Sequence, residues 1–218
     1  MAEMRTDEET VEAIKDWWKK NGTSLLIGIV AALAIVFGWQ AWQQQQVDYR
    51  TEAASQFASL INAYTDESQQ DRAETVAFVA TTLREDYSDS AYAVYGSLIH
   101  ARQQMIDQGN AEAAISTLEW ANSKTDQSKP LALIIRSRLA RAQFEIEQYD
   151  AALSTIDGAT NTDSFGAIFS ELRGDILLAQ GNSDGAREAY LQAREQSGVE
   201  RSGILELKLA DLGVGEAS

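Results

Sequence analysis

The stretch that most constrains this chain is Ser24–Trp42, which reads SLLIGIVAALAIVFGWQAW. From Leu25 to Trp39 it carries no charged and no strongly polar side chain. As an α-helix it would span about 28 Å, close to the roughly 30 Å hydrocarbon core of a bilayer. Trp39 and Trp42 stand at its far end, where indole rings favour the membrane–water interface. The stretch therefore predicts a single membrane-spanning helix.

Two other interpretations of this stretch stay open. A buried core helix can be equally apolar, although so long an apolar run near a chain end is rarely core. A cleaved signal peptide needs a basic n-region, a shorter apolar run and a small-residue cleavage site. Here the preceding region is long and acidic, and the exit reads Trp39-Gln40-Ala41-Trp42. An uncleaved signal anchor is the favoured interpretation.

The flanking charges predict an orientation for the span. Lys15, Lys19 and Lys20 lie close to its N-terminal end, whereas the first basic residues beyond it are Arg50 and Arg72. Basic residues near a span stay on the cytoplasmic side. We therefore expect the N-terminus in the cytoplasm and the C-terminal part in the periplasm of a Gram-negative cell.

Composition limits the partners of the C-terminal part. Of the formal net charge of −15, the segment from Gln43 onward holds 14 basic and 27 acidic residues, which gives −13. Such an acidic domain argues against nucleic acid, because phosphate binding needs a basic surface. The absence of cysteine excludes disulfides and thiolate chemistry. With a single proline and abundant Ala, Gln, Glu and Leu, the composition favours an all-α fold.

The N-terminal tail has a helical pattern of its own. Thr6-Asp7-Glu8-Glu9 fits a capping box, and Val11, Ile14 and the Trp17–Trp18 pair share one helical face. We expect a separate amphipathic helix of about 13 residues that Asn21-Gly22 ends. It would lie at the membrane interface or dock a cytosolic partner, with disorder as a third interpretation.

Beyond the span the pattern stays helical. Residues 43–64 continue the helix, a polar break follows at 65–70, and a second helix fits Arg72–Arg84. The inward-facing residues of this second helix are Val76, Val79, Ala80 and Leu83. The expected domains are a tail with its helix (1–23), the span (24–42), a helical linker (43–87), repeats (88–212) and a flexible C-terminus (213–218).

The C-terminal half contains an internal repeat. Three segments share one pattern, and each begins with a turn signal such as Gly109 or Gly181. After the turn comes a small residue, then a large apolar residue four positions later, and then a second small residue three positions after that. The first alanine recurs at spacings of 38 and 34 residues, and a 34-residue helix–turn–helix period is typical of tetratricopeptide repeats. The triplets are Ala114, Leu118, Ala121; Ala152, Ile156, Ala159; and Ala186, Tyr190, Ala193.

The first helix of each repeat should carry a small residue twelve positions before the first alanine of the triplet. Ala140 and Gly174 satisfy this, whereas Arg102 does not, so the first repeat is irregular. The four extra residues fit the loop 122–129 before Pro130. The alternative is an unrelated helical bundle in which the alanines recur by chance.

The sequence offers little catalytic chemistry. His100 is the only histidine and has no convincing serine or acid partner for a triad. Glu145, Glu147 and Asp150 could hold a cation, although an exposed charged helix end is the plainer interpretation. No phosphate-binding, dinucleotide or metalloprotease motif is present. We expect no enzyme activity and no cofactor.

The repeats instead predict a protein-binding surface. Helical repeats stack into a concave surface that binds peptides or partner helices, and the first helix of each pair lines it. The alternative is that these residues pack against an adjacent helix. Projecting the period gives the candidate partner-binding residues Ile99, Gln103, Ile106, Ile134, Arg138, Arg141, Phe144, Glu171, Leu172, Asp175 and Leu178.

The chain as a whole resembles a known family. The acidic tail with Val11-Glu-Ala-Ile14 and Trp17-Trp18-Lys-Lys20-Asn-Gly22, the span that ends near Gly38-Trp39 and the repeats closely resemble the YfgM family, the ancillary SecYEG translocon subunits. The stretches Leu172–Leu178 and Gly185–Tyr190 are also similar to that family.

The resemblance implies a non-catalytic, single-pass protein of the inner membrane with a periplasmic tetratricopeptide domain. It implies association with the SecYEG translocon and a membrane-anchored periplasmic chaperone, and help in handing nascent secretory proteins to chaperones. Regulation of envelope stress signalling is an alternative function. A third is a self-assembling membrane tether, since Gly28, Ala31, Ala32, Ala34 and Gly38 permit close packing of two spans.

Overall fold

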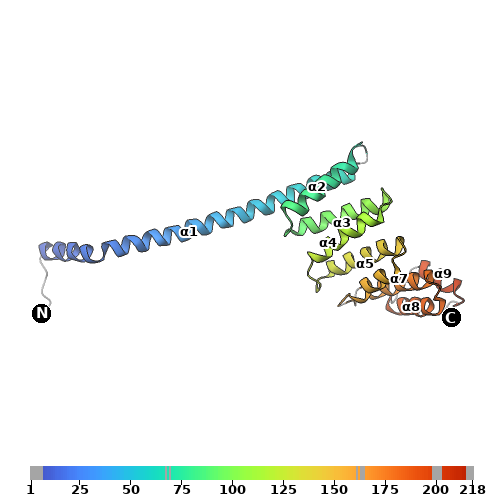
Figure 1. Cartoon of the computed structure of the whole chain (residues 1–218). Helices are drawn as coiled ribbons and strands as arrows, with labels where there is room; N and C mark the ends of the chain where they lie inside the picture. The colour runs from blue at the N-terminus through green and yellow to red at the C-terminus, as the bar shows by residue number, and fades with distance from the viewer. Residues whose placement is uncertain are drawn as a thin grey trace. The chain divides into compact units, whose positions relative to one another are not determined.

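The computed structural model describes residues 7–66, 68, 70–160, 162, 165–197 and 203–214 (Figure 1). Every regular element in these residues is a helix, which confirms the all-α class. The chain divides into two compact units, Met1–Glu52 and Ala53–Ser218, which are described separately. The helices are α1 (Asp7–Thr65), α2 (Arg72–Asp86), α3 (Ala91–Ile106), α4 (Ala111–Ser123), α5 (Pro130–Glu145), α6 (Tyr149–Asp157), α7 (Gly166–Ala179), α8 (Ser183–Gln196) and α9 (Gly203–Asp211).

The first unit is the N-terminal part of α1. Among the described residues, α1 is the one helix long and apolar enough to cross a membrane, with a mean hydropathy of 2.1 over its most apolar 18 residues. Only 6% of that window is buried, and side chains such as Ile27 and Ile35 are exposed. A core helix would bury these side chains, so the buried-helix interpretation of this stretch is wrong.

The expected end of a separate tail helix at Asn21-Gly22 is wrong, because α1 continues through it. The Asn21 side chain donates to the carbonyl of Trp17 inside the helix at 3.1 Å. Gly22 is not in the left-handed conformation that ends a helix, and the Trp18 ring covers it, 3.1 Å from where a Cβ would lie. Thr6 of the proposed capping box lies outside the described residues.

The second unit is a series of helix pairs. As predicted, α1 continues beyond the span, and it ends at Thr65, one residue later than expected. Also as predicted, α2 begins at Arg72 and buries Val76, Val79, Ala80 and Leu83. The pairs α3/α4, α5/α6 and α7/α8 follow in order, and each packs on the next through α4/α5 and α6/α7 (Figure 1). The C-terminal α9 packs on α8. Each pair therefore buries its apolar stripes against its neighbours rather than in one central core.

The residues that the repeat pattern singled out lie at the crossings of the pairs. In the first and third triplets every residue is at most 1% exposed, and in the second Ala152 and Ile156 are buried while Ala159 is half-buried. Ala140 is fully buried, and Gly174 is buried too. Arg102 is exposed, as its misfit to the pattern suggested. The repeat interpretation thus predicted the packing of α3–α8.

The turns inside the three pairs share one backbone feature. Gly109, Glu147 and Gly181 have φ values of 60°, 61° and 81°, and they stand at the same 38- and 34-residue spacings as the crossing alanines. In the outer pairs the next residue, Asn110 or Asn182, caps the second helix by accepting a backbone N–H at 3.0 Å. In the middle pair Gln148 makes no such bond.

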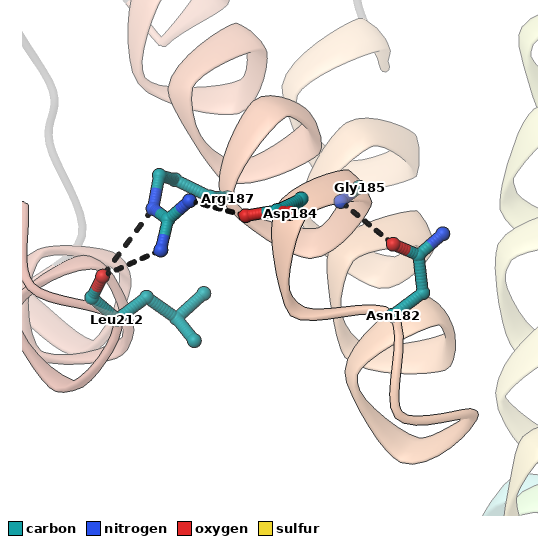
Figure 2. A network of polar contacts seen from close by, with 5 residues as sticks. All are labelled: Asn182, Asp184, Gly185, Arg187 and Leu212. Atoms are coloured by element: carbon teal, nitrogen blue, oxygen red, sulfur yellow. Dashed lines mark hydrogen bonds and ion pairs between the residues drawn. The ribbon is translucent and has the colours of Figure 1, made fainter.

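The last pair is tied to α9 by a polar network. The guanidinium of Arg187 donates to the carbonyl of Leu212 through Nε at 3.3 Å and Nη2 at 3.1 Å, and Nη1 bonds Asp184 at 2.7 Å (Figure 2). Leu205 and Leu209 of α9 are buried beside the third triplet. The Arg187 bonds thus hold the residue that follows α9 against α8.

Candidate partner-binding surface

The candidate residues lie on α3, α5 and α7, the first helices of the three pairs, but they do not form one continuous exposed surface. Gln103 is 1% exposed and Leu172 is 3% exposed. Leu172 packs in the cluster between the second and third pairs. Both side chains are therefore inaccessible to a partner.

On α7 the candidate surface is covered by α9. Lys208 Nζ of α9 donates to Glu171 Oε1 at 2.8 Å and to Asp175 Oδ2 at 2.9 Å. Burial lowers the pKa of Lys208, but the hydrogen bonds to the two carboxylates outweigh it and leave that pKa raised. The protein's own helix therefore occupies this part of the surface, while Leu178 stays 40% exposed beyond it.

On α3 and α5 the surface is open and forms a pocket of about 280 Å³. It is lined by four apolar residues and three arginines, which are Ala101, Met105, Ile106, Leu118, Arg102, Arg138 and Arg141. We call this site the arginine pocket. It brings together three of the predicted residues, Ile106, Arg138 and Arg141.

Two of the three arginines make polar contacts, and none of these contacts is to an acidic group. Arg102 donates to the Tyr64 hydroxyl and lies over the Tyr64 ring, 5.8 Å from its centre. Arg138 donates to the Leu98 carbonyl at 3.4 Å. In the part of the chain that the structure describes, none of the three forms an ion pair with a carboxylate. The pocket is thus a local concentration of positive charge.

Arg138 is affected both by burial and by the charges of the other two arginines. Burial first, and then the charges of Arg102 and Arg141, lower the pKa of Arg138 below the usual arginine value. Like charges held together in a partly desolvated site raise one another's free energy. An anion placed among them would relieve this repulsion.

Comparison with known proteins decides the family. A family model of the tetratricopeptide repeat-like domain matches residues 15–214. A protein of Haemophilus influenzae is 31% identical over 212 residues, which are 97% of this chain and 100% of its own length, and it is named ancillary SecYEG translocon subunit. The chain belongs to this family of ancillary SecYEG translocon subunits. Family members of the same name match in Escherichia coli, at 29% identity over 95% of this chain and 97% of theirs, and in Neisseria gonorrhoeae, at 26% over 97% and 100%.

Family membership accounts for the combination seen here of one apolar N-terminal helix with a tetratricopeptide-like domain, and it indicates a membrane-anchored protein. The likeness extends along nearly the whole chain, so it includes the helix as well as the repeats. No solved structure gives a significant match to the chain.

The remaining candidates contribute mainly to packing. Ile99 contacts the cluster of α1, α2 and α3, and Phe144 packs beside Tyr149 with ring centres 5.9 Å apart. Ile134 is half-buried on α5. These side chains border the accessible surface rather than form it.

The sequence-based candidates do not include three residues of the arginine pocket on α3, namely Ala101, Arg102 and Met105. For Arg102 a signal was present in the sequence, because Arg102 and the predicted Ile106 are four residues apart and share a helical face.

His100 belongs to the packing of the first pair. It is 8% exposed, and its Nδ1 has no hydrogen-bond partner among the described residues. Burial, and then the charge of Arg84, lower its pKa, so the imidazole is neutral at pH 7. No group of three His, Cys, Asp or Glu residues that could hold a metal occurs in the described part of the chain.

Proposed function

We propose that this protein is a non-catalytic accessory subunit of the SecYEG translocon that links emerging secretory proteins to periplasmic chaperones. The observation that carries this proposal is the match to translocon subunits over nearly their full length and nearly all of this chain. The aligned residues cover 100% of the Haemophilus influenzae relative and 97% of the Escherichia coli one, and they include both the apolar helix and the repeats of this chain.

The anchor and the repeats support this role together. Helical-repeat surfaces bind peptides and partner helices without chemistry of their own. In this domain the accessible part of that surface is the arginine pocket and Leu178, because α9 covers Glu171 and Asp175. A span that holds such a surface at the inner membrane keeps it where secretory proteins emerge.

The proposed orientation puts the repeats in the periplasm. Lys15, Lys19 and Lys20 precede the span, and they favour a cytoplasmic N-terminus. The same orientation places the acidic repeat domain on the side where chaperones meet translocated chains.

Site-specific photo-crosslinking in intact membranes tests the proposal. A photoreactive residue at Arg141 or at Leu178 should give adducts with translocon subunits, with a membrane-anchored chaperone or with nascent secretory chains. The same residue at Glu188, which is exposed on the second helix of the third pair, serves as the control. Adducts with other copies of this chain alone, at both positions, would reject the proposal.

A second proposal concerns envelope stress signalling through the N-terminal part of α1. Val11, Ile14 and Trp17 are 49%, 62% and 53% exposed and lie on one helical face, which suits the docking of a regulator. Replacing residues 8–20 with a helical sequence of the same charge but without this face should abolish signalling and leave the crosslinks of the repeat domain unchanged. Loss of both would attribute the effect to failed membrane insertion instead.

A further inference from the structure

We propose that the arginine pocket binds an acidic segment of a partner protein in which a carboxylate lies next to an apolar side chain. The inference rests on the proposed function only in assigning this surface to protein partners. The chemistry of the partner follows from the pocket itself.

Two regions of the same surface show opposite arrangements. On α7 the surface presents carboxylates, and a basic residue of this chain, Lys208, meets both of them. On α3 and α5 the surface presents Arg102, Arg138 and Arg141, and no carboxylate of the described chain meets them. The first region is satisfied within the chain, whereas the second lacks its acidic counterpart.

The guanidinium groups suit a carboxylate in geometry as well as in charge. A guanidinium presents parallel N–H donors that match the two oxygens of a carboxylate, and such bonds are about twice as strong as neutral ones. The contact with Tyr64 holds Arg102 in place before a ligand arrives. Less side-chain entropy is then lost when the carboxylate binds.

The walls of the pocket argue for a peptide rather than a small free anion. Met105, which is half-buried, and Ile106, which is 65% exposed, give the pocket accessible apolar surface beside the arginines. Inorganic phosphate would make no use of that apolar surface, whereas a leucine or similar side chain next to the carboxylate would pack on it. Methionine adapts its shape to different apolar groups, so Met105 suits a site that accepts several sequences.

The acidic domain makes the attraction local. Since the segment from Gln43 onward carries −13, most of its surface repels an acidic peptide, and the arginine pocket is a place that attracts one. This contrast directs an acidic segment to the pocket and discourages it elsewhere. We therefore expect binding to be specific in position although it tolerates variation in sequence.

Binding of defined peptides to the full-length protein in detergent micelles tests the inference. The probe is the fluorescent, end-capped peptide Gly-Leu-Glu-Leu-Asp-Gly, followed by anisotropy. The comparison peptides replace the acids by their amides, or the leucines by glycine. Protein variants are Arg138→Gln and Arg141→Gln, with Arg173→Gln as the matched control, since Arg173 is an α7 arginine outside the pocket that pairs with Asp157.

We expect the probe to bind and its affinity to fall about tenfold or more with Arg138→Gln or Arg141→Gln, but not with Arg173→Gln. The amide peptide and the glycine peptide should each bind at least about tenfold more weakly than the probe, and added salt should lower the affinity for the probe. Unchanged thermal unfolding of the variants shows that the fold is intact.

Four results would overturn the inference. In the first, the probe does not bind at millimolar concentration. In the second, the amide peptide binds as tightly as the probe, and in the third the glycine peptide does so and inorganic phosphate displaces the probe completely. In the fourth, Arg173→Gln weakens probe binding as much as Arg138→Gln or Arg141→Gln does. A second copy of this chain as the occupant would appear as a dimer that Arg141→Gln dissociates without any peptide. If only this inference failed, the crosslinks from Leu178 to the translocon would still form. If only the proposed function failed, the peptide would still bind but those crosslinks would be absent.

Discussion

The ring of Tyr190 lies where any other residue at position 174 would place its side chain. A Cβ on Gly174 would be 2.3 Å from Cε1 of Tyr190. The Tyr190 hydroxyl donates to Asp175 Oδ1 at 2.7 Å, and burial together with this bond raises the pKa of Tyr190. Helices α7 and α8 therefore approach closely because one carries no side chain at the contact and the other fills the space with an anchored ring.

Gly174→Ala should destabilise the domain. Overpacking costs about 1–3 kcal/mol and exceeds the gain of about 1 kcal/mol from alanine's helix propensity. We expect a net loss of up to about 2 kcal/mol, measured as a lower midpoint of thermal unfolding of the full chain in detergent. Gly203→Ala is the control, because nothing lies within 4 Å of its Cβ position. Equal midpoints for the two variants would contradict the close contact.

Glu147→Gly should stabilise the domain. Glu147 has φ 61° in the turn position where the other pairs have glycine. A left-handed conformation costs a non-glycine residue about 1–2 kcal/mol, and replacement by glycine removes this cost. Part of the gain is cancelled, because glycine has more conformational freedom to lose when the chain folds. We expect a gain of about 0.5–1 kcal/mol, which raises the unfolding midpoint by roughly 2–4 °C per kcal/mol.

Two further variants check the origin of this gain. Gln148→Asn should add about 1 kcal/mol, because asparagine can cap α6 as Asn110 and Asn182 cap α4 and α8. Gly181→Ala should lower the stability, because φ at this position is 81° and alanine is strained in a left-handed conformation. A destabilised Glu147→Gly variant would mean that the Glu147 side chain makes a contribution larger than the backbone strain.

These turns show what sequence could and could not predict. Gly109 and Gly181 were recognised because glycine at a helix end is itself a signal, and the alanine spacing then placed the helix pairs. Glu147 carries no such signal, so its left-handed backbone is a consequence of the packing of α5 on α6. Local pattern thus predicted the repeat, while the conformation at its middle turn required the tertiary structure.

The binding surface was predicted less completely than the fold. Repeat projection identified the helices α3, α5 and α7 correctly, but it assumed that each exposes the same positions. Gln103 is buried in the first pair, and Lys208 of α9 covers the carboxylates on α7. The covering of α7 depends on α9, which follows the repeats, and a period within the repeats carries no information about that helix.

Acidification should weaken the first pair through His100. Its folded-state pKa lies below the usual histidine value of 6.5, because burial and then Arg84 disfavour the charged imidazole. The stability from the neutral, buried ring is therefore complete above pH 6.5 and is lost as the pH falls toward the folded-state pKa.

Comparison with His100→Gln isolates this effect. The difference in unfolding free energy between wild type and variant should shrink as the pH falls below 6.5, with a slope no steeper than about 1.4 kcal/mol per pH unit, the limit for one proton. Urea unfolding at several pH values measures it. Parallel curves for the two proteins would show that carboxylates alone cause the acid sensitivity.

The proposed orientation can be tested with single cysteines, since the chain has none of its own. Ser123→Cys, exposed at the end of α4, should react with a membrane-impermeant maleimide in cells whose outer membrane is permeabilised. Ala13→Cys, exposed before the span, should react only after the inner membrane is disrupted. The opposite labelling pattern would reverse the assignment made from Lys15, Lys19 and Lys20.

Lys208→Met should release α9 from the third pair. The variant loses both bonds of the ammonium group and leaves Glu171 and Asp175 as neighbouring like charges. Because these groups are about a quarter exposed, we expect a cost of about 1–2 kcal/mol rather than the 3–5 kcal/mol of a fully buried pair. Faster hydrogen exchange confined to residues 203–211 would measure the release.

The triple variant Lys208→Met, Glu171→Gln, Asp175→Asn separates charge from packing. Neutral amides do not repel each other, so the triple variant should regain much of the protection of α9 if the ion pairs neutralise a like-charge site. Lys124→Met is the control, because its pair with Asp89 is longer, at 3.6 Å, and more exposed. If the triple variant exchanged as fast as Lys208→Met, the contact of the Lys208 ammonium with the Tyr190 ring, 5.6 Å from its centre, would hold α9 in place rather than the ion pairs with the two carboxylates.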